Sequence, residues 1–133
     1  MESKPIAMVI EDNEDLNAIF SSALERAGYV VHSVFNGADA KELLNDIVPS
    51  IITLDLHMPG VSGEKVLEYI RSQARLDKVR VIVATADPRA ADAMHVQPEL
   101  VLLKPISFSQ LSQLASRFSP NRGISPIEPD KPA

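Results

Sequence analysis

The chain has 133 residues, with 13 lysines and arginines against 18 aspartates and glutamates and a formal net charge of −5, a size that predicts one domain able to bury a core without disulfides or metals. It contains no cysteine, which excludes disulfides, thiolate metal sites and cysteine nucleophiles and suits a cytoplasmic protein. No apolar run approaches the roughly 18 residues of a membrane span, the N-terminus lacks a signal-peptide pattern, and no basic patch predicts direct contact with nucleic acid.

The first part of the chain alternates two strand-like segments with two helical ones. Residues 6–10 (IAMVI) are continuously apolar, which predicts a buried strand, whereas residues 29–35 (YVVHSVF) include polar side chains and are predicted to lie at a sheet edge. Between them, apolar residues recur at helical spacing, and Gly28 follows as the expected stop of that helix. The two helical faces consist of Leu16, Ile19, Phe20, Ala23, Leu24 and Ala27 in the first helix, and of Ala40, Leu43, Leu44 and Ile47 in the second.

The rest of the chain continues this alternation. Residues 50–54 and 79–84 are apolar runs typical of central strands, and residues 100–103 (LVLL) form a fifth strand. Residues 88–97 have room for only a short helix. Residues 119–133 are rich in proline, so we expect one domain over residues 1–118 and a disordered tail or linker after it. The two remaining helical faces consist of Val66, Ile70 and Ala74, and of Phe108, Leu111, Leu114, Ala115 and Phe118.

Polar side chains stand where four of the five predicted strands end. Strands that alternate with helices predict an α/β fold with a parallel sheet covered on both faces, and the carboxyl ends of such strands form the ligand crevice. An aspartate after a strand more often caps the next helix than performs chemistry. Capping does not explain why several strands deliver polar groups to one edge. These groups are Glu11 and Asp12 after the first strand, Asp55 after the third, Thr85 at the end of the fourth and Lys104 after the fifth.

The charges of these residues indicate a cation site. Two carboxylates held about 4 Å apart repel each other by roughly 4 kcal/mol at an effective dielectric constant near 20, so the cluster should hold protons or bind a cation. Oxygen ligands without cysteine favour a hard ion such as Mg²⁺. Mg²⁺ and Lys104 together would balance three carboxylates, which permits one of the carboxylates to accept a phosphoryl group.

At these positions the sequence resembles the receiver domains of bacterial response regulators. The resemblance covers residues 5 to about 118 and rests on the acidic pair in MVIEDNE, the aspartate in LDLHMPGVSG, the threonine in VIVATA and the Lys-Pro pair in LLKPIS. It implies a doubly wound, five-stranded parallel sheet of flavodoxin-like order 2-1-3-4-5, with helices on both faces.

The resemblance also implies a role for each site residue. A sensor histidine kinase or phosphotransfer protein would phosphorylate Asp55. Asp12, Asp55 and the backbone carbonyl of His57 would ligate Mg²⁺ directly, and Glu11 would act mainly through water. The Thr85 hydroxyl would form a hydrogen bond with the phosphoryl group, and Lys104 would pair with the phosphoryl oxygens. The peptide bond between Lys104 and Pro105 would be cis.

Two features depart from the family pattern. Val101 stands where the family often has a tyrosine or phenylalanine that switches position on phosphorylation. The interval between Thr85 and Lys104 is slightly short, which predicts a truncated fourth helix. We therefore expect a small rearrangement centred on residues 85–98 in place of an aromatic flip.

The function that this pattern favours is a phosphorylatable signalling switch, not a metabolic enzyme. It would switch a surface for a downstream protein that the sequence does not name, or for a second copy of the chain. One alternative is a receiver-like binding module that acts without phosphorylation, since Val101 weakens the switch. Another is a Mg²⁺ phosphatase of the haloacid-dehalogenase kind, but such enzymes generally carry a second aspartate where this chain has His57.

Overall fold

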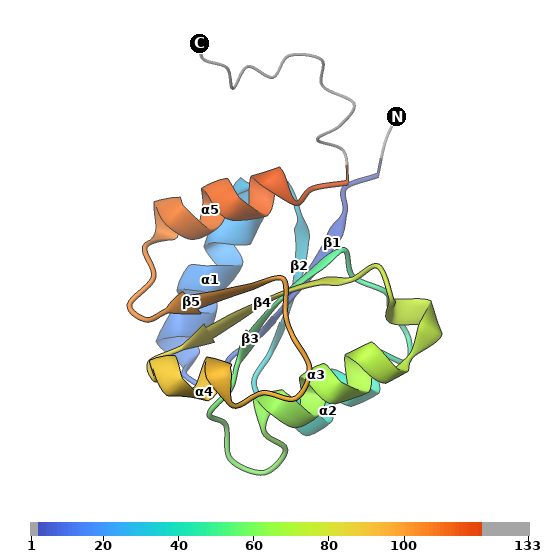
Figure 1. Cartoon of the computed structure of the whole chain (residues 1–133). Helices are drawn as coiled ribbons and strands as arrows, with labels where there is room; N and C mark the ends of the chain where they lie inside the picture. Colours follow the sequence, from blue (N-terminus) through green and yellow to red (C-terminus); the bar gives the residue numbers. More distant parts are fainter. Residues whose placement is uncertain (1–2, 121–133) are drawn as a thin grey trace.

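The computed structural model describes residues 3–120, and its strands alternate with helical segments (Figure 1). Every predicted strand is present, with ends that differ by one residue or less from those of the apolar runs. The elements are β1 (Ile6–Ile10), α1 (Glu14–Arg26), β2 (Val30–Val34), α2 (Gly37–Leu43), β3 (Ile51–Asp55), α3 (Gly63–Ser72), the short 3-10 helix η1 (Ala74–Leu76), β4 (Arg80–Thr85), α4 (Pro88–Asp92), β5 (Leu100–Leu103) and α5 (Phe108–Arg117).

The five strands form one parallel sheet in the order β2-β1-β3-β4-β5. Helices α1 and α5 cover one face, and α2 and α3 cover the other (Figure 1). The predicted flavodoxin-like architecture is therefore confirmed, including the position of β2 at an edge. Because both faces of the sheet are covered, all five residues of β3, the central strand, are buried.

Local sequence signals determine where the helices begin and end. The side chains of Asn13, Asn36, Ser62 and Ser107 each accept a hydrogen bond from a backbone N–H in the first turn of α1, α2, α3 and α5. Helix α1 ends at Arg26, and Gly28 follows with φ of 102°, a left-handed conformation that favours glycine. The predicted stop at Gly28 is confirmed.

Three residues of the predicted helical faces are exposed. Ile19 and Phe108 are 43% and 37% exposed, because the buried stripe of α1 is narrower than its apolar pattern and Phe108 is the first residue of α5. Ala74 is exposed and begins η1, because α3 ends at Ser72. Ile19 and Phe108 belong to the predicted helices α1 and α5, whereas the assignment of Ala74 to α3 was wrong.

Helix α4 is truncated, as the sequence predicts. It has only five residues, and the chain reaches β5 through an irregular segment. Val101 of this strand is half-buried and packs against the core on the α2/α3 face. Of the expected tail, residues 121–133 lie outside the described part of the chain. Within residues 3–120, none of the helices combines the length and hydrophobicity needed to cross a bilayer.

Candidate functional site

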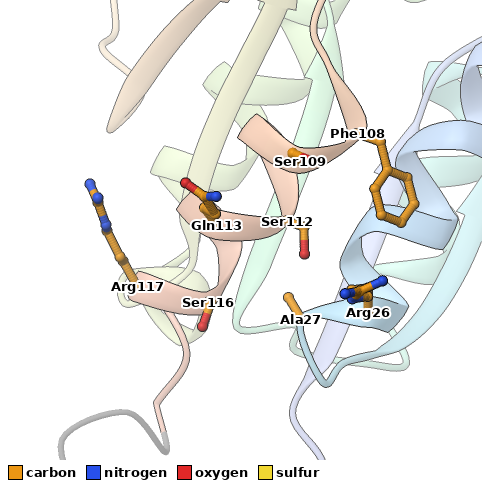
Figure 2. Close-up of a pocket in the computed structure, with 8 residues that line it drawn as sticks. All are labelled: Arg26, Ala27, Phe108, Ser109, Ser112, Gln113, Ser116 and Arg117. Atoms are coloured by element: carbon orange, nitrogen blue, oxygen red, sulfur yellow. The ribbon is translucent and has the colours of Figure 1, made fainter. Parts of the chain in front are cut away.

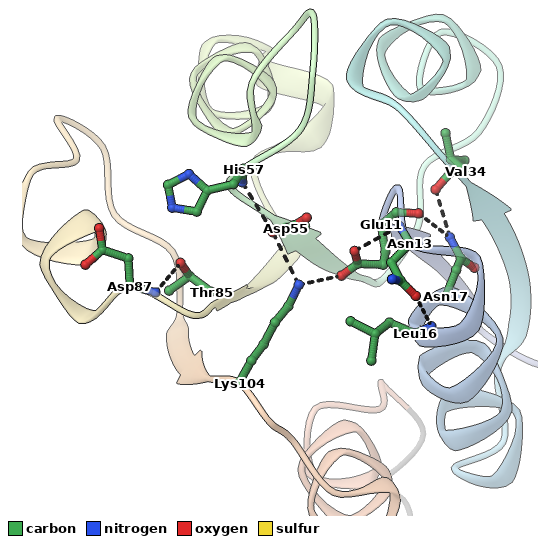
Figure 3. A network of polar contacts seen from close by, with 10 residues as sticks. All are labelled: Glu11, Asn13, Leu16, Asn17, Val34, Asp55, His57, Thr85, Asp87 and Lys104. Carbon is green, nitrogen blue, oxygen red and sulfur yellow. Dashed lines mark hydrogen bonds and ion pairs between the residues drawn. The ribbon is translucent and has the colours of Figure 1, made fainter.

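Polar side chains meet at the carboxyl ends of the strands (Figure 3). Glu11 follows β1, Asp55 ends β3 and Thr85 ends β4, and their exposed fractions are 2%, 5% and 0%. Lys104 follows β5 and extends its side chain toward the same place (Figure 3). The structure therefore brings together the side chains that the sequence predicted to meet at this edge.

Lys104 links the two buried carboxylates. Its Nζ lies 2.9 Å from Glu11 Oε1 and 3.5 Å from Asp55 Oδ1. The lysine side chain is only 18% exposed, so these charges interact with little screening by solvent. The positive charge offsets part of the repulsion between the two carboxylates.

Three carboxylates form a cluster that can hold a cation. Glu11, Asp12 and Asp55 each offer an oxygen atom, and these atoms lie within 4.8 Å of one another. Asp12 is the exposed member, whereas the other two are buried. Oxygen donors at this spacing suit a hard divalent cation.

The position of Glu11 in this cluster changes the pKa of its carboxyl group. Burial raises the pKa of the Glu11 carboxyl above its ordinary value. Hydrogen bonds from Lys104 and from the backbone N–H of Asn13 lower that pKa, while the negative charge of Asp55 raises it further. The raised pKa means that the fold disfavours the charged form of Glu11 when no cation is bound.

A tight loop after β3 holds Asp55. The backbone N–H of His57 donates to Asp55 Oδ1 at 3.2 Å, and the N–H of Gly63 donates to the carbonyl of Leu56 at 3.0 Å. Gly60 has φ of 79°, so the Pro-Gly turn predicted from the sequence uses the conformational freedom of glycine. The His57 side chain is exposed and points away from Lys104 (Figure 3).

Thr85 and Lys104 are connected through the backbone. The N–H of Lys104 donates to the carbonyl of Thr85 at 2.8 Å, and the Thr85 hydroxyl accepts from the N–H of Asp87 at 3.1 Å. The peptide bond between Lys104 and Pro105 is cis, which confirms the expectation from the sequence. The loops after β4 and β5 therefore both begin at the site.

One residue at this edge was not predicted. Asn17 of α1 is 1% exposed, and its Nδ2 donates to the carbonyls of Glu11 at 3.0 Å and Val34 at 2.9 Å (Figure 3). The available signal was a polar side chain three residues before Phe20, within the buried stripe of the helix.

A groove of about 740 Å³ lies elsewhere, between the end of α1 and the outer side of α5 (Figure 2). Arg26, Phe108 and Arg117 are among the residues that line it. None of the polar residues at the strand ends lines this groove.

Comparison with known proteins agrees with this geometry. The family model of the response regulator receiver domain matches residues 7–116. The chain belongs to the response regulator receiver domain family. Receiver domains act in two-component signalling as switches and interact with histidine kinases or phosphotransfer proteins.

Relatives of this receiver domain include whole response regulators and parts of larger proteins. It is 31% identical over 103 residues to the polar-differentiation response regulator DivK of Brucella anthropi, covering 75% of this chain and 84% of that protein. It is 32% identical over 102 residues to the regulator of RpoS of Escherichia coli strain K12, covering 74% of this chain. The match to hybrid signal transduction histidine kinase D of Dictyostelium discoideum is 33% over 86 residues and 65% of this chain. The chain spans only 30% of the length of the regulator of RpoS and 6% of that of the kinase.

Solved structures show the same fold. A signal receiver domain from Vibrio parahaemolyticus has a TM-score of 0.77 and 28% identity, covering 87% of this chain and 90% of that one. The chemotaxis protein CheY4 of Vibrio cholerae has a TM-score of 0.76 and 20% identity, covering 87% of this chain and 99% of that one. The second likeness concerns the fold alone.

Proposed function

We propose that this receiver domain accepts a phosphoryl group on Asp55 from a histidine kinase or phosphotransfer protein, with the help of Mg²⁺, and thereby switches a protein–protein surface. The observation that carries this proposal is the placement of Asp55 Oδ1 3.5 Å from Lys104 Nζ, within a cluster of three carboxylates. A cluster of this composition has no evident use in folding, because burying Glu11 and Asp55 side by side costs stability.

The donor set fits Mg²⁺. Asp12, Asp55 and the backbone carbonyl of His57 would hold the ion directly, and Glu11 would act mainly through water. Mg²⁺ supplies positive charge that neutralises these carboxylates and the oxygens of an incoming phosphoryl group. Burial is the main cause of the raised pKa of Glu11, and a cation beside this carboxylate would favour its charged form.

The transfer itself forms one bond and breaks another. An oxygen of the Asp55 carboxylate attacks the phosphorus atom of a phosphohistidine, a P–O bond forms, and the P–N bond to the imidazole breaks as that ring leaves with its electron pair. Lys104 then pairs with a phosphoryl oxygen, and the Thr85 hydroxyl donates a hydrogen bond to another. Hydrolysis of the acyl phosphate by water returns the carboxylate and releases inorganic phosphate.

Switching follows from the new contacts. Lys104 and Thr85 begin the loops after β5 and β4, and drawing both side chains toward a phosphoryl group would move these loops. Val101 has little volume to displace, so the rearrangement would centre on residues 85–98 and would present a changed surface to a downstream protein or to a second copy of the chain.

The test is phosphorylation by a small donor such as acetyl phosphate in the presence of Mg²⁺, read by intact mass. We expect wild type to gain one phosphoryl group and Asp55→Asn to gain none. Asp77→Asn is the matched control, because Asp77 is exposed just before β4, at the opposite end of the sheet, and this variant should be labelled like wild type.

Labelling of Asp55→Asn would show that another residue is the acceptor. A wild-type protein that stays unlabelled, and that a phosphorylated histidine donor also fails to label, would contradict the proposal. Such a protein would be a binding module that acts without phosphorylation.

A further inference from the structure

Asn17 is a buried polar side chain, and both hydrogen bonds that it donates lie where the acidic pair leaves the sheet. The side-chain amide group donates both of its hydrogens to carbonyl oxygens, those of Glu11 and Val34. Its Oδ1 accepts from the Ser21 hydroxyl at 3.1 Å, and that hydroxyl lies 2.8 Å from the hydroxyl of Ser33. Because carbonyls only accept hydrogen bonds, this arrangement allows one orientation of the amide.

The two carbonyls mark the point where the sheet ends and the site begins. The pairing of β1 with β2 ends at Ile10 and Val34, and the N–H of Glu11 makes the last backbone bond to the Val34 carbonyl at 3.1 Å. The Glu11 carbonyl belongs to the peptide group that joins Glu11 to Asp12. Its orientation sets the direction in which both acidic side chains leave the backbone.

Leucine, serine and aspartate would not supply the same contacts at this position. Two donors on a short, uncharged group are needed to serve both carbonyls, which asparagine provides. Leucine has a similar shape but no donor. Serine has one donor, and aspartate would place lone pairs and a further negative charge against the carbonyls and the cluster.

We propose that Asn17 is a positioning residue for the cation site: it fixes the peptide between Glu11 and Asp12 so that both carboxylates are already aimed at the ion. This inference rests on the proposed function, since it assigns Asn17 a part in Mg²⁺ binding without contact to the ion. Groups that orient metal ligands typically contribute about 10-fold to 100-fold in metal affinity. Asn17 acts on the backbone of the ligands, so the lower end of that range is expected.

The experiment compares Mg²⁺ affinity in wild type, Asn17→Leu and Ser21→Ala. Titration of the full chain with Mg²⁺, followed by amide shifts in NMR spectra, gives each dissociation constant, and urea unfolding in EDTA reports the integrity of each fold. We expect about a 10-fold weaker affinity in Asn17→Leu. Ser21→Ala removes the contact to Oδ1 but keeps both donors, so its affinity should equal that of wild type.

A second variant covers the case in which Asn17→Leu does not fold. Asn17→Ser keeps one donor and leaves room for water, and it should weaken Mg²⁺ binding less than leucine but more than Ser21→Ala does. A merely structural role would lower the stability of the Asn17 variants and leave their affinity for Mg²⁺ unchanged, and that result would overturn the inference. Equal weakening in Ser21→Ala would overturn it too. A wild-type protein that binds no Mg²⁺ would contradict the proposed function. If wild type binds Mg²⁺ and the Asn17 variants bind it equally tightly, only this inference is contradicted.

Discussion

Lys104 holds together a pair of carboxylates that would otherwise repel each other inside the fold. Its Nζ contacts both Glu11 and Asp55, which are 2% and 5% exposed. A charge-assisted hydrogen bond of this kind is stronger than a neutral one, and losing one partner leaves the other charge buried without compensation. The same lysine competes with any cation for these carboxylates. Lys104 therefore raises the stability of the metal-free protein and lowers its affinity for a metal ion.

Because Lys104 both stabilises the carboxylates and competes with a cation, we predict two effects of Lys104→Met. We expect the free energy of unfolding in EDTA to fall by about 1–3 kcal/mol, because two buried carboxylates lose their positive partner. We expect Mg²⁺ to bind more tightly than in wild type, because the site becomes more negative. Urea unfolding and Mg²⁺ titration measure the two effects. Lys65→Met, at an exposed position of α3, should change neither, and weaker Mg²⁺ binding in Lys104→Met would refute the argument.

The site residues could be predicted because they follow apolar strands directly. Asp55 and Thr85 end such runs, so the parallel sheet alone brings their side chains to one edge. The partner of Lys104 could not be predicted, since the sequence does not reveal that Glu11 accepts at 2.9 Å while Asp55 lies at 3.5 Å. The contacts of Asn17 could not be predicted for a similar reason: they depend on how closely α1 packs against the ends of two strands.

At the scale of elements, the beginning of α3 packs directly against the end of β3. A Cβ atom added to Gly63 would clash with the backbone carbonyl of Asp55 and would lie 2.6 Å from Leu56 Cα. The N–H of Gly63 donates to the Leu56 carbonyl in the same contact. Glycine is needed here for close approach, and any larger residue must push the helix away from the backbone that carries Asp55.

Gly63→Ala should therefore lower both stability and reactivity. We expect a loss of about 1–3 kcal/mol in the free energy of unfolding, typical of overpacking against rigid backbone. We also expect slower labelling of Asp55 by acetyl phosphate, because the backbone of that residue is displaced. Lys65→Ala, in the same first turn but exposed, serves as the control and should stay close to wild type. Unchanged stability in Gly63→Ala would mean that α3 can shift without cost.

The contacts of the segment after α4 could not be predicted from the sequence. The short interval predicted a truncated helix, but not the contacts that replace it. Arg71 of α3 donates to the carbonyls of Gln97 and Val79 and pairs with Glu99 at 2.8 Å. Glu99 also accepts from the N–H of Val81 at 2.6 Å. These contacts join residues that are distant in the sequence, so no local sequence pattern predicts them.

At the scale of the whole molecule, α5 closes the fold by packing against α1, which begins some 90 residues earlier. The hydroxyl of Tyr29, at the end of the α1–β2 connection, donates to the carbonyl of Ala115 at 2.7 Å. Tyr29 is 2% exposed, and burial raises its pKa to about 12 from 10.0, against smaller opposing effects of Ser119 and Arg80. The folded chain therefore keeps this proton at a pH where the unfolded chain releases it.

The raised pKa gives the wild-type protein a stability that is fully present below about pH 10, the value of an unfolded tyrosine, and lost as the pH rises toward 12. Tyr29→Phe should lower the free energy of unfolding by about 1 kcal/mol at neutral pH, because the Ala115 carbonyl loses the hydrogen bond from the Tyr29 hydroxyl and keeps only the one from the N–H of Phe118. It should also show a smaller further loss on going to pH 11 than wild type does. Urea unfolding at both pH values measures this difference.

Tyr69→Phe is the matched control, because Tyr69 and Tyr29 are the two tyrosines of the chain. The variant should keep the full alkaline loss of stability, and tyrosinate absorbance in it should report Tyr29 alone, with a midpoint near 12. A midpoint near that of free tyrosine would mean that solvent reaches the Tyr29 hydroxyl. The contact between the α1–β2 connection and α5 would then open at a pH well below that of global unfolding. Helix α5 would in that case detach locally while the rest of the chain stays folded.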